Sequence, residues 1–270
     1  MYQEKARFEP DVAHGRGIPE FKNILVDLDR TARVQPALDV AEALADRCGA
    51  NLRVIDAMES PEGGAPHEVL LREIEIFGHD LIVRSQERDR VARAAVNKRL
   101  FRHSRCPVWA VGSRPKLWRP AILAAVNAFT HDPLTEALNA QAIQFALRLA
   151  ELFNGDVTIL HAWRQPAEER LQALYTETYF DALLRSTVRG AGNALQHSVE
   201  SIGRRSRTPR VELPRGTAEQ VIPGFLVSEG IDVLVAGARG ERGIWPLVFG
   251  STAERLLEMA TCSVVAVKSP

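Results

Sequence analysis

An internal repeat restricts the possible folds of this chain more than any other feature. Four short apolar segments occur twice, in the same order, within the 270 residues. In one-letter code the pairs are NILVDLD with AILAAVN, NLRVID with DVTILH, GHDLIV with GIDVLV, and CPVWAV with CSVVAV. The pairs begin at residues 23 and 121, 51 and 156, 78 and 230, and 106 and 262. Self-similarity of this kind indicates two copies of one structural unit.

Each repeated segment is a nearly continuous apolar run, which is typical of a strand buried on both faces of a sheet. Helical patterns lie between these runs. In residues 133–152 apolar side chains recur at helical spacing, with Asp132 positioned to cap the helix and Asn154-Gly155 to end it. Strand, helix and strand at this spacing form a βαβ unit. We therefore predict an α/β protein built from two parallel-sheet domains.

The two copies differ in length. The second has room between residues 162 and 231 for a long helical stretch, a strand near Arg210–Leu213 and a short helix at Ala218–Ser228. The matching gap in the first copy, residues 57–79, holds one helix at most, so we expect four strands in the first sheet and five in the second. The predicted divisions are an N-terminal extension at 1–20, a shortened domain at 21–115 and a complete domain at 116–270.

Composition excludes several classes of protein. The 34 basic and 34 acidic residues balance, which argues against a bulk polyanion binder. No apolar run is long enough to span a membrane, and the polar N-terminus lacks the apolar core of a secretory signal, so we expect a cytoplasmic protein. The cysteines Cys48, Cys106 and Cys262 are widely spaced. We predict neither a disulfide framework nor a metal site.

A glycine-rich loop in the second copy carries the chemistry. Gly237-Ala238-Arg239-Gly240 follows a predicted strand, and Gly250-Ser251-Thr252 opens a predicted helix nine residues later. Glycines allow close approach of the backbone, and the helix N-terminus favours negative charge. Arg239 adds a cation, and the two hydroxyls add donors. Walker, dinucleotide and nucleophile-elbow patterns are absent from the sequence, so the loop predicts a different kind of phosphate site.

The spacing G-x2-G-x9-G-[ST] resembles the nucleotide-binding branch of the universal stress protein family. The segments ILHAW and CSVVAVK are similar to that family as well, and the likeness covers residues 116–270 more closely than 21–112. The resemblance implies tandem Rossmann-like domains of the adenine nucleotide alpha hydrolase-like type. It also implies a stress-response protein that binds ATP, with or without Mg²⁺, and acts as a nucleotide-dependent regulator.

The resemblance also implies roles for individual residues. Adenine would lie near the ends of the first two strands of the second copy, and the phosphates near the glycine-rich loop. The implied nucleotide-binding residues are Ala125, Val126, Asn127, Ala162, Gly237, Arg239, Gly240, Gly250, Ser251 and Thr252. Asn127 departs from the family's usual Asp, and Ala253 from a second hydroxyl. In the first copy Asp29 matches that Asp, but Ser85, Arg88, Ala94 and Ala95 replace the loop glycines and hydroxyl, so we predict that this copy does not bind ATP.

Three functional alternatives follow from these residues. The first is a nucleotide-dependent regulator without catalytic residues, because the loop contains no general base, carboxylate pair or metal cluster. The second is a slow ATPase that acts by positioning alone. The third is a scaffold or a binder of apolar ligands with a vestigial nucleotide site. Large apolar residues in the insert motivate the third alternative, although we expect them to lie in the core or at a domain interface: Trp163, Leu171, Leu174, Tyr175, Tyr179, Phe180, Leu183 and Leu184.

Other candidate features are assigned structural roles. We expect His161 to be a buried strand histidine, Cys106 and Cys262 to be small buried residues, and the basic stretch Arg84–Arg105 to be a solvated helix rather than a nucleic-acid surface. The last strands, Pro107–Val111 and Ser263–Val267, are predicted to pair and join the two domains as an intramolecular pseudo-dimer. A further homodimer and a protein partner are left open.

Overall fold

The computed structural model describes residues 21–28, 35–59, 63–85, 91–129, 132–165, 167–201, 208–238 and 260–268, with the backbone alone at 91–94 and 201. The strands in these ranges are β1 (Asn23–Asp27), β2 (Asn51–Ile55), β3 (Leu81–Ser85), β4 (Val108–Val111), β5 (Ala121–Ala125), β6 (Asp156–Leu160), β7 (Arg210–Glu212), β8 (Val233–Gly237) and β9 (Ser263–Val267). The helices are α1 (Gln35–Cys48), α2 (Pro66–Phe77), α3 (Val91–His103), α4 (Pro133–Phe153), α5 (Glu168–Leu174), α6 (Glu177–Ser201) and α7 (Ala218–Ser228).

The described strands form one sheet in the order β2-β1-β3-β4-β9-β8-β5-β6-β7. The four strands β1–β4 make up the first half of this sheet, and the five strands β5–β9 make up the second half. Neighbouring strands within each half are parallel. The strand numbers expected from the unequal repeat are therefore found, and β7 and α7 are the extra strand and short helix predicted for the second copy.

The two halves join through their last strands. β4 and β9 are antiparallel, with Val108 opposite Ala266 and Trp109 opposite Val265. The backbone N–H of Gly112 adds a hydrogen bond of 3.0 Å to Ser263 Oγ. Pairing covers what would otherwise be two exposed strand edges. The predicted strand pairing is confirmed, and it makes the two sheets continuous.

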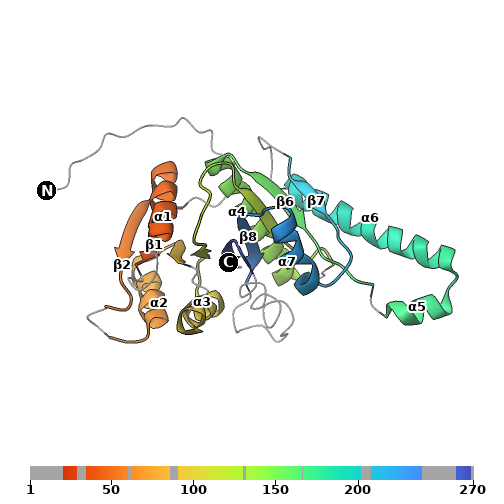
Figure 1. Cartoon of the computed structure of the whole chain (residues 1–270), viewed down its shortest axis with the longest axis horizontal. Helices are drawn as coiled ribbons and strands as arrows, with labels where there is room; N and C mark the ends of the chain where they lie inside the picture. The colour runs from red at the N-terminus through yellow and green to blue at the C-terminus, as the bar shows by residue number, and fades with distance from the viewer. Residues whose placement is uncertain are drawn as a thin grey trace.

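Helices cover both faces of the sheet (Figure 1). α1 and α4 pack on one face, and their apolar side chains share a single core with both halves of the sheet. On the other face, α2 and α3 cover the first half and α7 covers the second. Figure 1 shows α6 running away from the sheet beyond β7, with α5 at its far end. β2 and β7 therefore form the two edges of the sheet.

The predicted boundaries of α4 are confirmed. Asp132 accepts hydrogen bonds from the backbone N–H and the hydroxyl of Thr135, at 3.2 and 2.6 Å, and so caps the helix. Asn154 ends the helix in the left-handed conformation, with φ 55°. A Cβ on Gly155 would lie 2.6 Å from the Pro120 carbonyl oxygen, so only glycine allows β5 and β6 to begin side by side here.

Candidate functional site

The predicted base-binding residues meet at the carboxyl ends of β5 and β6. Ala125 is opposite Leu160 in the sheet register, and the Val126 N–H donates to the Leu160 carbonyl at 3.0 Å. Asn127 directly follows Val126, and Ala162 lies two residues after Leu160; all four predicted residues are half-buried. Ligands of open α/β sheets bind at the carboxyl ends of the strands. The location therefore suits a ligand, whereas the sequence alone gave only the order of the residues.

Asn127 is held by Asn139 of α4 and by its own loop. Its backbone N–H donates to Asn139 Oδ1 at 3.0 Å, and its carbonyl accepts from Asn139 Nδ2 at 2.7 Å. Its side-chain Oδ1 accepts the Phe129 N–H at 3.2 Å. Within the described residues, Asn127 Nδ2 makes no hydrogen bond. The side chain therefore offers a ligand a neutral donor, where the family's usual Asp would offer a charged acceptor.

The His161 ring contacts the loop that contains Asn127. It is buried, as predicted, and its Nδ1 lies 3.3 Å from both the Ala128 nitrogen and the Val126 carbonyl oxygen. The ring also contacts Phe129 edge-on, with 4.7 Å between centroids. Burial lowers the pKa of His161 below its ordinary value, which favours the neutral ring. His161 thus positions the backbone on both sides of Asn127.

Only part of the predicted phosphate loop lies within the described residues. Gly237 ends β8, beside the carboxyl end of β5. A Cβ at this position would lie 2.8 Å from Leu138 Cβ of α4, so packing of the helix on the sheet already requires glycine here. Arg239, Gly240, Gly250, Ser251, Thr252 and Ala253 lie outside the described residues. The Gly237 position therefore has a structural reason that is independent of any ligand.

The first half carries a buried ion pair at the corresponding strand ends. Asp27 Oδ2 lies 3.0 Å from Arg84 Nη2, and the two side chains are 2% and 3% exposed. Asp27 Oδ1 also accepts the Ala57 N–H at 3.1 Å. In the repeat, Asp27 and Arg84 match Ala125 and Ala236, which are opposite each other in the second half as this pair is in the first. Large charged side chains therefore occupy in the first half the positions that alanines occupy in the second.

Sequence reasoning missed this ion pair. Arg84 was assigned to a solvated basic helix, but it lies in β3, and α3 begins only at Val91. The signal was present, because a lone Asp and a lone Arg end two matched apolar runs. Buried charges without a partner are costly, so two such residues on strands of one sheet should be expected to pair. Asp29 and Arg88 lie outside the described residues.

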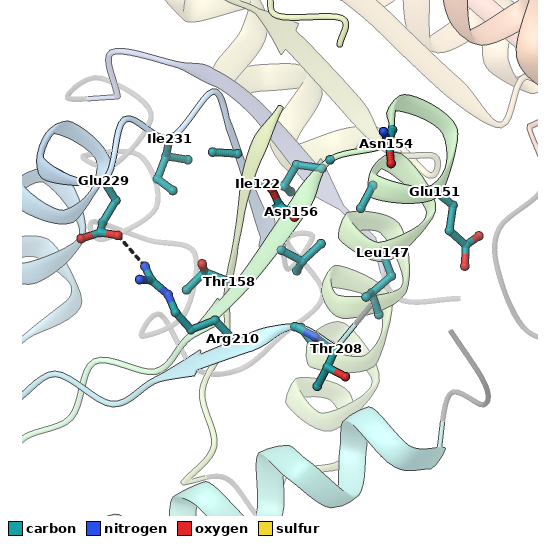
Figure 2. Close-up of a pocket in the computed structure, with 15 residues that line it drawn as sticks. Ile122, Leu147, Glu151, Asn154, Asp156, Thr158, Thr208, Arg210, Glu229 and Ile231 are labelled. Atoms are coloured by element: carbon teal, nitrogen blue, oxygen red, sulfur yellow. Dashed lines mark hydrogen bonds and ion pairs between the residues drawn. The ribbon is translucent and has the colours of Figure 1, made fainter. Parts of the chain in front are cut away.

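A cavity of about 400 Å³ lies near the amino ends of β5 and β6, whereas the predicted site is at their carboxyl ends. Figure 2 shows the residues that line this cavity. The cavity surrounds the amino end of β6 and is lined in part by Glu151, Asp156 and Arg210. Arg210 is paired with Glu229 at 2.6 Å, and the cavity also borders the C-terminal end of α4. The carboxylates of Glu151, Asp156 and Glu229 and the C-terminus of α4 disfavour an anion in this cavity. This cavity is therefore a poor phosphate site despite its size.

The predictions of burial were correct for the two cysteines but only partly correct for the apolar insert. Trp163 and Phe180 are buried, but Leu174, Tyr175 and Tyr179 are exposed, so the prediction that the whole group lies in a core or an interface was wrong. Cys106 and Cys262 are buried, as predicted. Burial raises the pKa of Cys106 to about 11, which keeps the thiol protonated and unreactive.

Comparison with known proteins identifies the family. Residues 131–268 match the universal stress protein family. The chain belongs to this family. Over 209 residues it is 26% identical to universal stress protein E of Escherichia coli K12, a match that covers 75% of this chain and 65% of the relative. Universal stress protein E of Salmonella typhi is 26% identical over 212 residues, with the same coverage. The chain thus spans about two thirds of the length of these curated relatives.

Solved structures share the fold of this universal stress protein. A functionally unknown protein from Pseudomonas aeruginosa PAO1 is similar over 92% of this chain and 93% of its own, with a TM-score of 0.71 and 21% identity. A universal stress protein from Archaeoglobus fulgidus is similar over 92% and 86%, with a TM-score of 0.56 and 14% identity. These likenesses support the predicted α/β, Rossmann-like fold. Within the described residues, the structure contains no helix that is both long and apolar enough to cross a membrane.

Proposed function

We propose that this universal stress protein binds an adenine nucleotide, ATP with or without Mg²⁺, in its second half and acts as a nucleotide-dependent regulator of a cytoplasmic stress response. Residues 116–270 would form the complete, nucleotide-binding domain, and residues 21–115 a degenerate partner domain. The contrast between the two halves carries this proposal. The second half has Ala125 and Ala236 where the first half has the buried Asp27–Arg84 ion pair.

The residues at the site suit a neutral base more than a charged one. Ala125 and Ala162 are small and half-buried, which leaves an apolar surface for a ring. Asn127 Nδ2 could donate a hydrogen bond to a ring nitrogen of adenine. The phosphates would extend toward Gly237 and the loop that continues through Arg239, Gly240, Gly250, Ser251 and Thr252, where backbone N–H groups favour anions. No carboxylate stands at Asn127 to hold Mg²⁺, so any metal would be held mainly by the phosphates.

Thermal melts with and without millimolar MgATP test the proposal. ATP at about a hundred times its dissociation constant should add roughly 2.7 kcal/mol of stability, or on the order of 5–10 °C in midpoint for a chain of this size. Gly250→Val should remove the shift. The double substitution Ala125→Asp, Ala236→Arg should also remove it, because it copies the first-half ion pair into the second half.

The pair Ala125→Ser, Ala236→Ser is the matched control. It adds only small side chains, so it should retain most of the shift. Each variant is first melted without nucleotide to confirm cooperative unfolding. A wild-type protein free of bound nucleotide that shows no shift would reject the proposal, and so would a shift that survives in A125D/A236R. Phosphate release in the same samples separates a binder from a slow ATPase.

A further inference from the structure

A groove of about 450 Å³ lies between α6 and the carboxyl ends of β6 and β7. Its apolar lining comes from Trp163, Leu184 and Val188, and its charged lining from Arg185, Arg189 and Arg215. The volume falls in the range of small-molecule sites, about 300–1,000 Å³. The lining therefore offers apolar contact and positive charge in one place.

Local structure holds these residues in place. Trp163 pairs with Arg215 in a parallel bridge that continues the β6–β7 ladder, and Trp163 Nε1 donates to the Leu213 carbonyl at 3.0 Å. The indole is therefore satisfied as a donor and presents only apolar surface to the groove. On α6, Leu184, Arg185, Val188 and Arg189 recur at helical spacing, which places them along one side of the helix. The groove is thus built from secondary structure and not from flexible loops.

Charge in the groove is positive and incompletely balanced. Arg215 forms an ion pair with Glu168 of α5. Arg185 and Arg189 form no ion pair within the part of the chain that the structure describes. A neighbouring hollow, which shares Leu184 and Arg215 with the groove, contains the acidic residues Glu177 and Asp181 instead. Charge therefore distinguishes the two hollows, and only the groove attracts an anion.

We propose that this groove binds a free amphiphilic anion, a carboxylate or phosphate head group carried on an acyl-like apolar chain. The head group would lie among Arg185, Arg189 and Arg215, where charge-assisted hydrogen bonds are strongest. The chain would lie on Trp163, Leu184 and Val188. The groove is lined by none of the residues of the nucleotide site, so this inference does not depend on the function proposed above.

Isothermal titration of the full chain with hexanoate, octanoate and decanoate, without nucleotide, tests the proposal. We expect one saturable site whose affinity rises roughly fourfold for each added methylene. Arg185→Ala with Arg189→Ala should weaken decanoate binding at least about tenfold. Arg105→Ala with Arg114→Ala removes the same charge from exposed positions elsewhere and should change nothing. Circular dichroism and the thermal midpoint of each variant confirm its folding.

Three further comparisons complete the test. Decanol should bind much more weakly than decanoate, and inorganic phosphate more weakly than octyl phosphate. Equal binding within either pair would overturn the proposal. The groove would then recognise only the apolar chain or only the charged head group, and not the two together. Vesicles of phosphatidylglycerol and phosphatidylcholine separate a free ligand from a membrane surface. Binding to these vesicles without saturable decanoate binding would also overturn it.

Discussion

Asp27 and Arg84 form an ion pair of 3.0 Å whose two side chains are almost completely buried, at the strand ends where the other half of the sheet has Ala125 and Ala236. The two copies of the repeated unit therefore share a fold but differ in the side chains at this position. In the first half the protein's own charges occupy the carboxyl ends of the strands. In the second half these positions are small and uncharged.

Removal of one partner of this pair should be strongly destabilising. We expect Asp27→Ala to lower the free energy of unfolding by about 3–5 kcal/mol, because it leaves a guanidinium buried without its carboxylate. Asp27→Ala with Arg84→Ala, which copies the second half, should cost less than the sum of the single changes. Urea unfolding of the four proteins measures this cycle. Additive losses would show that the two side chains do not depend on each other.

The packing role of Gly237 can be separated from a ligand role. Gly237→Ala should lower stability by about 1–3 kcal/mol in the absence of nucleotide, because its Cβ would lie 2.8 Å from Leu138 Cβ. Leu138→Ala alone should cost about 2–5 kcal/mol through the cavity it leaves. Although Cβ remains, Leu138→Ala frees the helix to shift, so the double variant should lose less than the sum. If the double variant lost the full sum of the two single losses, the effect of Gly237→Ala would not arise from its contact with Leu138.

The buried His161 predicts a loss of stability in mild acid. Its pKa is lowered in the folded protein, so below about pH 6.5 the unfolded chain takes up a proton that the folded chain resists. Stability should therefore fall as the pH drops from about 7 to 5. His161→Asn keeps an acceptor for the Ala128 N–H but does not titrate, so its stability should fall less. His67 and His79, whose pKa values are also lowered, are unchanged in this comparison.

The buried Lys268 predicts a gain of stability at mildly alkaline pH. It follows β9 and donates to the Phe101 carbonyl of α3, and burial lowers its pKa from 10.5 to about 8. Above pH 8 the folded chain releases a proton that the unfolded chain keeps, so stability should rise. Cys106, with its pKa raised from 9.0 to about 11, opposes this rise above pH 9. Between pH 8 and 9, the wild type should therefore gain stability relative to Lys268→Met, as measured by urea unfolding.

Strand positions could be predicted because each repeated run is apolar and bounded by polar or helix-ending residues. The longer gap between these runs in the second copy also left room for its extra strand and short helix. The Asp27–Arg84 pair could not be read in this way, because it depends on which strands are neighbours in the sheet. Tyr175 and Tyr179 were misplaced for a related reason. Apolar spacing assigns a side to a helix, but not how far α5 and α6 extend beyond the edge of the sheet.

We propose above that the second half of the molecule binds an adenine nucleotide, and the first half, with its buried Asp27–Arg84 pair, should not. Isothermal titration of nucleotide-free protein with ATP, which counts sites directly, tests it most simply. We expect one site per chain in the wild type and none in A125D/A236R. Two sites per chain, or one site that remains in A125D/A236R, would contradict it.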